Sequence, residues 1–338
     1  MVVKIRILSS SIKPNAGYLT KGLKVSNVKY LHDKGFTGKG VRIGVIDTGC
    51  DINHTFIKPN VIAGADFLIN VKGTYYEASR PVENTTTQIM SGGNPIVCVR
   101  GKGNTSIVKN EEVDLEFSDE MIKGLNDGHF HGTHCSGLVV QAAPDCELVI
   151  ARALGSDGNG SYAAILNAFK YCVNKKCNII SMSLGGTIDS DALHKAIQDA
   201  VNNGIMVVTA AGNEGDGNAS TDETSYPANY WEVINVGSLN ADLTPADYSN
   251  TSRYVDVCAV GTNVVSCYPG NKWATATGTS QACPQVVGIA ACLRQKFIHD
   301  NGRVPTENEL YQELLRNTID LGYDKRIQGE GYVKVKED

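Results

Sequence analysis

The chain has 338 residues, of which 31 are Lys or Arg and 36 are Asp or Glu, so its formal net charge is −5. This acidic balance argues against nucleic acid or an anionic membrane as the main partner, because both require a basic face on the protein. With no apolar run of membrane-spanning length and no signal-like apolar core near its start, the sequence predicts a soluble, cytoplasmic protein with one sizeable hydrophobic core.

The first elements predicted along the chain are an arm and a buried strand. Residues 1–25 are expected to form the arm, which contains a short extended piece at residues 2–8 and a chain breaker, Pro14. The β-branched run at residues 41–46 predicts a buried strand that ends at Asp47. Open α/β sheets bind ligands beyond the carboxyl ends of their strands, so Asp47 is the first candidate site residue.

A change in composition marks residues 66–126 as an insertion. This stretch is rich in glycine, threonine and acidic residues, and it carries short alternating pieces but little helical periodicity. Such a pattern is typical of surface loops and hairpins. Two interpretations stay open, a flap that limits access to a cleft and a surface excursion without a role. The residues from 26 to 338 are expected to form one domain that carries this insertion.

Strands and helices alternate after the insertion. The expected strands cover residues 148–154, 179–184, 205–211, 233–237 and 254–260, and the expected helices cover residues 128–140, 162–173 and 192–202, a stretch that opens at Ser280, and residues 307–316. Alternation of this kind predicts an α/β fold with a doubly wound parallel sheet flanked by helices.

Three residue types used in hydrolysis stand at the ends of these elements. Ser280 opens a helix in a Gly-Thr-Ser run, where free backbone N–H groups stabilise negative charge. A serine hydroxyl needs an imidazole base and the base needs a carboxylate to orient it, for which His131 and Asp47 are the candidates. Asn213, on a glycine-flanked turn, is able to donate to an oxyanion. The alternative for Ser280 is an ordinary helix cap.

Four motifs in this order resemble the subtilisin family of serine peptidases. They are VIDTG at residues 45–49, HGTHCSG at 131–137, AAGNEG at 210–215, and GTS at 278–280 followed by Pro284. The resemblance implies a serine endopeptidase that acts on proteins or peptides through an acyl-enzyme intermediate. It also implies that Asp47, His131 and Ser280 are catalytic, and that Asn213 and the Ser280 backbone N–H hold the oxyanion.

The same resemblance implies where substrate binds. Ser183, Leu184 and Gly185 match the family's segment that pairs with the substrate backbone, and Tyr226 with Pro227 matches its segment with a cis proline. Main-chain pairing of this kind gives affinity with little side-chain selectivity.

Two departures from the family pattern leave an alternative open. The family usually has Met directly after the nucleophile and His after the proline, whereas this chain has Gln281 and Gln285. A catalytically silent peptide-binding or regulatory protein that uses the same cleft is therefore the alternative to an active peptidase.

No cofactor or metal ion is expected. The family's calcium loop after the histidine motif is missing, and Thr55-Phe56 stands where a partner aspartate belongs, so a tight calcium site is expected to be absent. The alternative is a zinc site formed by His129, His131 and His134. The interpretation weighed against it is that His134 makes a buried hydrogen bond. The chain is long enough to form a core without disulfide bonds. Its ten cysteines are therefore expected to be free thiols in a reducing cytoplasm.

The arm suggests how activity is controlled. The arm is the stretch of about 25 residues that precedes the matched region. It resembles the short N-terminal extension of intracellular subtilisins, which lies across the active site. We hypothesise that residues 2–14 bind the cleft as an extended strand and keep the enzyme latent until they are cut. The natural substrate, the side-chain preference and a homodimeric state are left undetermined.

Overall fold

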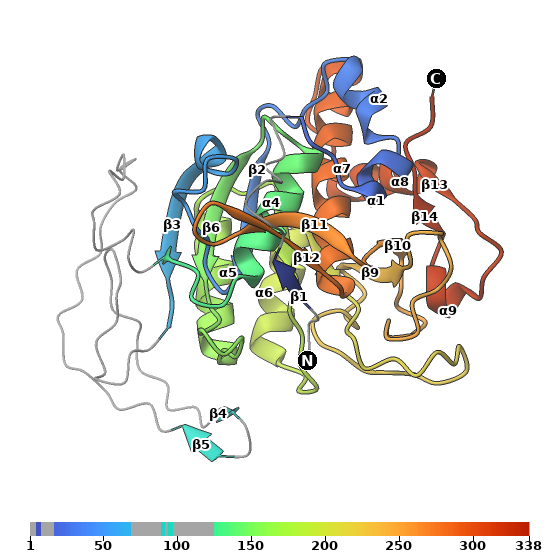
Figure 1. The fold of residues 1–338 in the computed structure, drawn as a ribbon. Helices are drawn as coiled ribbons and strands as arrows, with labels where there is room; N and C mark the ends of the chain where they lie inside the picture. The colour runs from blue at the N-terminus through green and yellow to red at the C-terminus, as the bar shows by residue number, and fades with distance from the viewer. Residues whose placement is uncertain (1–4, 8–16, 69–88, 92–93, 97–124, 338) are drawn as a thin grey trace.

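A mainly parallel sheet forms the centre of the molecule. The computed structural model describes residues 5–7, 17–68, 89–91, 94–96 and 125–337. The strand order is β13-β14-β10-β9-β8-β7-β2-β6-β3 (Figure 1), and every neighbouring pair is parallel except β13 and β14. The predicted α/β fold with a doubly wound parallel sheet is confirmed.

The strands of this sheet are short. They are β2 (Arg42–Asp47), β3 (Val61–Asp66), β6 (Glu147–Arg152), β7 (Ile179–Met182), β8 (Met206–Ala210), β9 (Ile234–Leu239), β10 (Val257–Val260), β13 (Thr318–Ile319) and β14 (Tyr332–Val333). The strand expected at residues 254–260 begins only at Val257, because the Val255 N–H donates to the Ser252 carbonyl in a turn. The edge strands β3 and β13, and β14 beside β13, were not expected.

Helices cover both faces of the sheet. One face packs against α1 (Lys21–Val25), α2 (Val28–Asp33), α4 (His131–Ala142), α7 (Thr279–Asn301) and α8 (Glu307–Arg316), and the other packs against α5 (Tyr162–Asn174) and α6 (Asp191–Asn202). Adjacent strand residues alternate between the two cores, as Val45 and Ile46 do in β2. Both faces are therefore buried, which accounts for the continuous apolar runs of the strands.

The order of the strands places a crevice at the end of β2. In the sheet β2 lies between β6 and β7, and the later strands β8, β9 and β10 are added beyond β7. The chain thus reverses the direction in which it adds strands at β2 and β7, and ligands bind at such switch points in open α/β sheets. Asp47 ends β2, and Ser183 follows β7.

Helices α4 and α7 approach each other closely. A Cβ on Gly288 of α7 would lie 2.4 Å from the Cβ of Ala142 and 3.0 Å from the Val139 carbonyl oxygen, so only glycine fits here. Both helices begin at the level of the crevice with a candidate site residue in their first turn, His131 in α4 and Ser280 in α7. Their tight packing fixes these two first turns relative to each other.

A smaller antiparallel sheet holds part of the arm. It comprises β1 (Ile5–Ile7), β12 (Lys272–Ala276) and β11 (Val264–Tyr268) in the order β1-β12-β11, and β1 pairs with β12 from Ile5 opposite Ala276 to Ile7 opposite Ala274 (Figure 1). The extended piece expected at residues 2–8 thus contains a strand. Leu19 and Leu23 are buried in the main core, so the stretch expected as arm joins the folded body before residue 25.

Little of the expected insertion falls within the described residues. They include β4 (Ile89–Ser91) paired with β5 (Asn94–Ile96) as a hairpin, and the start and end of the stretch. The rest of residues 66–126 lies outside the described residues. The hypothesis that the insertion forms a flap concerns this part of the chain.

The described cysteines are buried free thiols, which agrees with the expectation from sequence. Among the helices that the structure describes, none has both the length and the apolar character needed to cross a membrane.

Candidate active site

Asp47 and His131 form a buried pair at the crevice. The Asp47 carboxylate lies at the end of β2 and is 1% exposed, and His131 is the first residue of α4. The imidazole Nδ1 lies 2.8 Å from Asp47 Oδ1 and 3.0 Å from Oδ2, and the Thr48 backbone N–H donates to Oδ1 at 2.7 Å. A carboxylate only accepts hydrogen bonds, so Nδ1 carries the proton and Nε2 is left as the basic nitrogen. The structure thus brings together the two residues that the sequence offered as the base and the carboxylate that orients it.

The surroundings of His131 favour its protonated form. Burial disfavours the charged imidazolium, but the neighbouring Asp47 carboxylate and the Cys135 thiol outweigh it, so the pKa of His131 is raised well above its ordinary value. The Cys135 Sγ lies 3.8 Å from His131 Nδ1, one helical turn further along α4. Within the described residues His131 Nε2 has no hydrogen-bond partner, so it is available to take a proton.

Ser280 is buried in the first turn of α7 and is tied to two other elements. Pro284 lacks the N–H that would bond to the carbonyl four residues earlier, which is that of Ser280. The Ser183 hydroxyl donates to this carbonyl at 3.2 Å and the Cys135 thiol donates to it at 3.4 Å. The Ser280 Oγ itself donates to the Ser183 carbonyl at 3.3 Å. Ser280 is thus held at the ends of β7 and α4, and its hydroxyl is directed to Ser183 rather than to His131.

Asn213 lies in the loop after β8 with its amide orientation defined. Its Oδ1 accepts from the Thr279 backbone N–H at 2.8 Å and from the Thr279 hydroxyl at 3.1 Å. Because a backbone N–H only donates, its contact requires the amide oxygen, and the other end of the amide is the Nδ2 group with its two N–H donors. Asn213 is therefore joined to the residue directly before Ser280.

The segment expected to bind substrate follows β7. Gly186 and Tyr226 form an antiparallel bridge in which the Tyr226 N–H donates at 2.7 Å and the Gly186 N–H donates at 2.9 Å. The Tyr226–Pro227 peptide bond is cis, as the sequence resemblance implied. The segment expected to bind substrate therefore begins at the end of β7 with Ser183, which contacts Ser280. It continues through Leu184 and Gly185 to Gly186, which is held by its bridge to Tyr226.

The comparisons with known proteins agree with this geometry. Residues 38–332 match the model of the subtilase family. The chain is 33% identical over 325 residues to the major intracellular serine protease of Bacillus subtilis (strain 168), covering 93% of this chain and 87% of that protein. It is 35% identical over 303 residues to an intracellular serine protease of Paenibacillus polymyxa, covering 87% and 78%. Subtilisin E of Bacillus subtilis (strain 168) is 31% identical over 93% of this chain and 70% of its own length.

The chain belongs to the subtilase family. It is a subtilisin-type serine endopeptidase, and its substrates are proteins or peptides. This agrees with the family and the class of activity that the four sequence motifs indicated.

One buried carboxylate of this subtilase was not singled out from the sequence. Asp127 accepts five hydrogen bonds, which come from the Thr48 hydroxyl, the backbone N–H groups of His129 and Phe130, and the N–H and hydroxyl of Thr133. It connects the loop that follows Asp47 with the first turn of α4. The sequence signal was weak, because aspartate is favoured near helix starts but a capping residue normally directly precedes the helix, whereas Asp127 lies four residues before His131.

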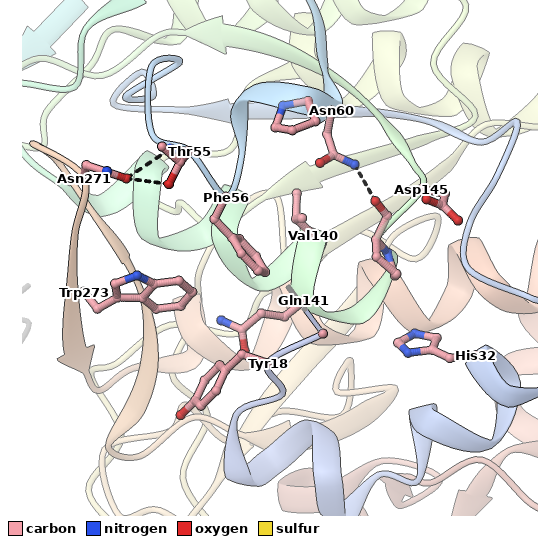
Figure 2. Close-up of a pocket in the computed structure, with 13 residues that line it drawn as sticks. Tyr18, His32, Thr55, Phe56, Asn60, Val140, Gln141, Asp145, Asn271 and Trp273 are labelled. Atoms are coloured by element: carbon pink, nitrogen blue, oxygen red, sulfur yellow. Dashed lines mark hydrogen bonds between the residues drawn. The ribbon is translucent and has the colours of Figure 1, made fainter. Parts of the chain in front are cut away.

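A cavity lies in this subtilase where the resemblance places the calcium loop of its relatives. The cavity has a volume of about 630 Å³, and Pro144 is among its lining residues. Figure 2 shows Phe56 and Val140 on its wall. The Phe56 ring packs against Trp273 with a centroid distance of 5.1 Å, and Trp273 also contacts Tyr18 at 5.7 Å. Calcium requires six to eight oxygen ligands. The aromatic rings on this wall support the prediction that a tight calcium site is absent, which stays a prediction.

The three histidines near α4 have different surroundings. His134 is fully buried, its Nε2 lies 3.3 Å from the Ala274 carbonyl oxygen, and burial lowers its pKa to about 3. This contact matches the structural alternative that was weighed against zinc. Among the described residues, the one grouping of three ligand side chains within metal-binding reach is Asp47, His131 and Cys135, and it includes neither His129 nor His134.

Proposed function

We propose that Asp47, His131 and Ser280 are the catalytic triad of this endopeptidase. The observation that carries the proposal is the buried 2.8 Å hydrogen bond between Asp47 and His131 Nδ1, which leaves Nε2 without a partner at the crevice where α7 presents Ser280. His131 takes the proton of the Ser280 hydroxyl, and Asp47 fixes the tautomer and stabilises the imidazolium. Before attack, the Ser280 hydroxyl turns from the Ser183 carbonyl to Nε2.

The reaction then proceeds in two halves. Ser280 Oγ bonds to the scissile carbonyl carbon, and the negative charge on the carbonyl oxygen is met by Asn213 Nδ2 and the Ser280 backbone N–H. The C–N bond breaks as His131 gives its proton to the leaving amine, which leaves an acyl group on Ser280. Water, deprotonated by His131, attacks this ester and releases the acid product and the free serine.

Substrates bind as extended peptides along Ser183, Leu184 and Gly185. These residues follow a strand of the central sheet, and an extended peptide is able to pair with their backbone groups. The bridge from Gly186 to Tyr226 holds the far end of the segment. Affinity then comes mainly from the main chain, and selectivity comes from pockets beside it.

The arm keeps the enzyme latent in the cytoplasm until it is removed. Support comes from β1, which pairs with β12, the strand that leads through Thr277 and Gly278 into Ser280. Ile5–Ile7 thus pair with the strand before the nucleophile and not with Ser183–Gly185, and the other residues from 2 to 14 lie outside the described part of the chain. Two of the relatives are intracellular serine proteases by name, which supports the cytoplasmic location.

The experiment that tests the triad is active-site labelling read by intact mass. The protein is treated with a serine-directed fluorophosphonate, alongside the Ser280→Ala variant and heat-denatured protein. One label on Ser280, absent from both controls, is expected. Loss of the arm from the wild-type chain but not from Ser280→Ala would also support self-processing. An unlabelled protein, even after limited tryptic removal of the arm, would instead favour the silent peptide-binding protein.

A further inference from the structure

The side chain next to the nucleophile is buried and unpaired. Gln281 follows Ser280, is 0% exposed, and within the described structure neither its Oε1 nor its Nε2 has a hydrogen-bond partner. Gln285, one turn later and also buried, differs, because its Nε2 donates at 2.7 Å to both the Val260 and the Gln281 carbonyl oxygens. A buried amide without partners is unfavourable, so an unpaired amide in an active site calls for an explanation.

The unpaired amide lies beside the amide of Asn213. A Cβ on Gly278 would lie 3.0 Å from Gln281 Oε1, 3.3 Å from Asn213 Oδ1 and 3.6 Å from Asn213 Nδ2. The space left by this glycine is therefore shared by the two side chains. Asn213 Oδ1 is already taken by Thr279, so the group that Asn213 is able to offer to a neighbour is its Nδ2.

The Nδ2 group of half-buried Asn213 is able to bind a second acceptor during the reaction. It carries two N–H donors, and the oxyanion takes one of them. The second N–H is free to bond to another acceptor, and Gln281 Oε1 is a buried acceptor without a donor among the described residues. A hydrogen bond between them would hold the amide plane and aim the first N–H at the oxyanion.

We propose that Gln281 is a positioning residue of the oxyanion hole, whose Oε1 accepts the second N–H of Asn213 Nδ2 when charge develops on the substrate carbonyl oxygen. This inference rests on the proposed role of Asn213. A methionine at this position, as is usual in the family, offers only a weakly accepting sulfur atom. The interaction is thus a property of the glutamine in this chain.

A double-mutant cycle tests the proposal. Gln281→Met is expected to lower kcat about tenfold in an otherwise unchanged enzyme, with KM within about twofold, because the contact forms only as the oxyanion does. In the Asn213→Ala background the same change is expected to alter kcat less than about twofold, because its partner is gone. The affinity of a peptide aldehyde, whose hemiacetal oxygen occupies the oxyanion position, should fall in parallel with kcat.

The matched control is Gln285→Met, the same chemical change one turn along α7. It removes two structural hydrogen bonds, so it should lower the melting temperature and combine additively with Asn213→Ala. Equal effects of Gln281→Met in both backgrounds, or an unchanged kcat, would overturn the inference while leaving the role of Asn213 intact. If Asn213→Ala itself leaves kcat unchanged, the proposed oxyanion hole fails and the inference fails with it. Gln281→Leu serves as a second variant if the first does not fold.

Discussion

The Asp127 carboxylate and the Thr48 hydroxyl are joined by a 2.9 Å hydrogen bond, and the Thr48 Oγ1 in turn accepts from the Gly132 N–H at 2.9 Å. Thr48 directly follows Asp47, and Gly132 directly follows His131. The two residues that form the buried pair are thus fixed not only by their own contact but also by a second connection through their neighbours. Asp127 is the point at which this connection is anchored, because it also accepts both donors of Thr133.

We therefore expect Asp127→Asn to damage both stability and activity. The amide nitrogen cannot accept, so at least one buried donor loses its partner, and the variant should lose about 2 to 4 kcal/mol of unfolding free energy. The looser placement of His131 should lower kcat more than it raises KM. Denaturant unfolding and steady-state kinetics check this, with Asp300→Asn on the surface as control. If Asp127→Asn unfolds with the wild-type free energy, the hydrogen bonds of Asp127 do not contribute to stability.

Activity should rise with pH through a limb that lies above 6.5, the ordinary pKa of histidine. His131 accepts the Ser280 proton only when its imidazole is neutral, and its pKa is raised by Asp47 and Cys135, so the enzyme stays inactive to a higher pH than an isolated histidine would dictate. A profile of kcat/KM from about pH 5 to 9 measures the limb. His194→Gln, which removes a surface histidine paired with Glu232, should leave it in place. A limb at or below 6.5 contradicts the expectation.

Stability should fall as pH rises from about 5 to 8, because two half-buried carboxyls have raised pKa values. Burial raises the pKa of Asp256 to about 6, and burial together with Asp256 raises that of Glu307 to about 7. Between the unfolded and folded pKa values the folded state binds more protons, so its stability is highest at the acid end and is lost as both groups ionise.

The substitution Glu307→Gln should flatten this dependence by roughly 1 to 3 kcal/mol at pH 8. Glu313→Gln, on the same helix α8 and paired with Arg316, is the control that should not. Urea unfolding at several pH values gives the slope. A slope that is unchanged in Glu307→Gln would mean that this carboxyl is not responsible.

Chelation should leave the thermal stability of the protein unchanged. The wall where the family's calcium loop belongs carries the rings of Phe56, Trp273 and Tyr18, and among the described residues the one carboxylate that lines this cavity is Asp145, whereas calcium is usually held by several carboxylate and carbonyl oxygens. The measurement is the melting temperature in excess EDTA and in added calcium. A large fall with EDTA that calcium reverses would show that a tight site exists after all.

A chain shortened to begin at Asn15 should be more active than the full-length protein. The shortening removes β1 but keeps Leu19, which is buried, and Thr20, whose N–H donates to Gln141 at 2.9 Å. Proline introduced in turn at Ile5, Arg6 and Ile7 weakens the pairing with β12 without shortening the chain, and should raise kcat/KM at the position where an N–H is used. Equal activity of the shortened and full-length chains would exclude inhibition by the arm.

Most of the central elements could be predicted from the sequence because their signals are local. The β-branched run before Asp47 and the periodicity of α5 and α6 each depend on residues within one segment. Strands β3 and β14 were missed for the opposite reason. The pattern of β3 is diluted by Ala63, Gly64 and Ala65, and β14 has two residues whose extended form depends on pairing with β10 and β13.

The sequence by itself determined the family and the four short motifs that contain Asp47, His131, Asn213 and Ser280, because each motif is contiguous and recognisable without its neighbours in space. The tertiary structure alone decided which groups these residues meet: that Asp127 ties the first two together, that the Ser280 hydroxyl rests on Ser183, and that one of two neighbouring glutamines is satisfied while the other is not. The partners of a buried polar group come from segments far apart in the chain, so its hydrogen bonds are fixed only when the sheet and the helices have packed.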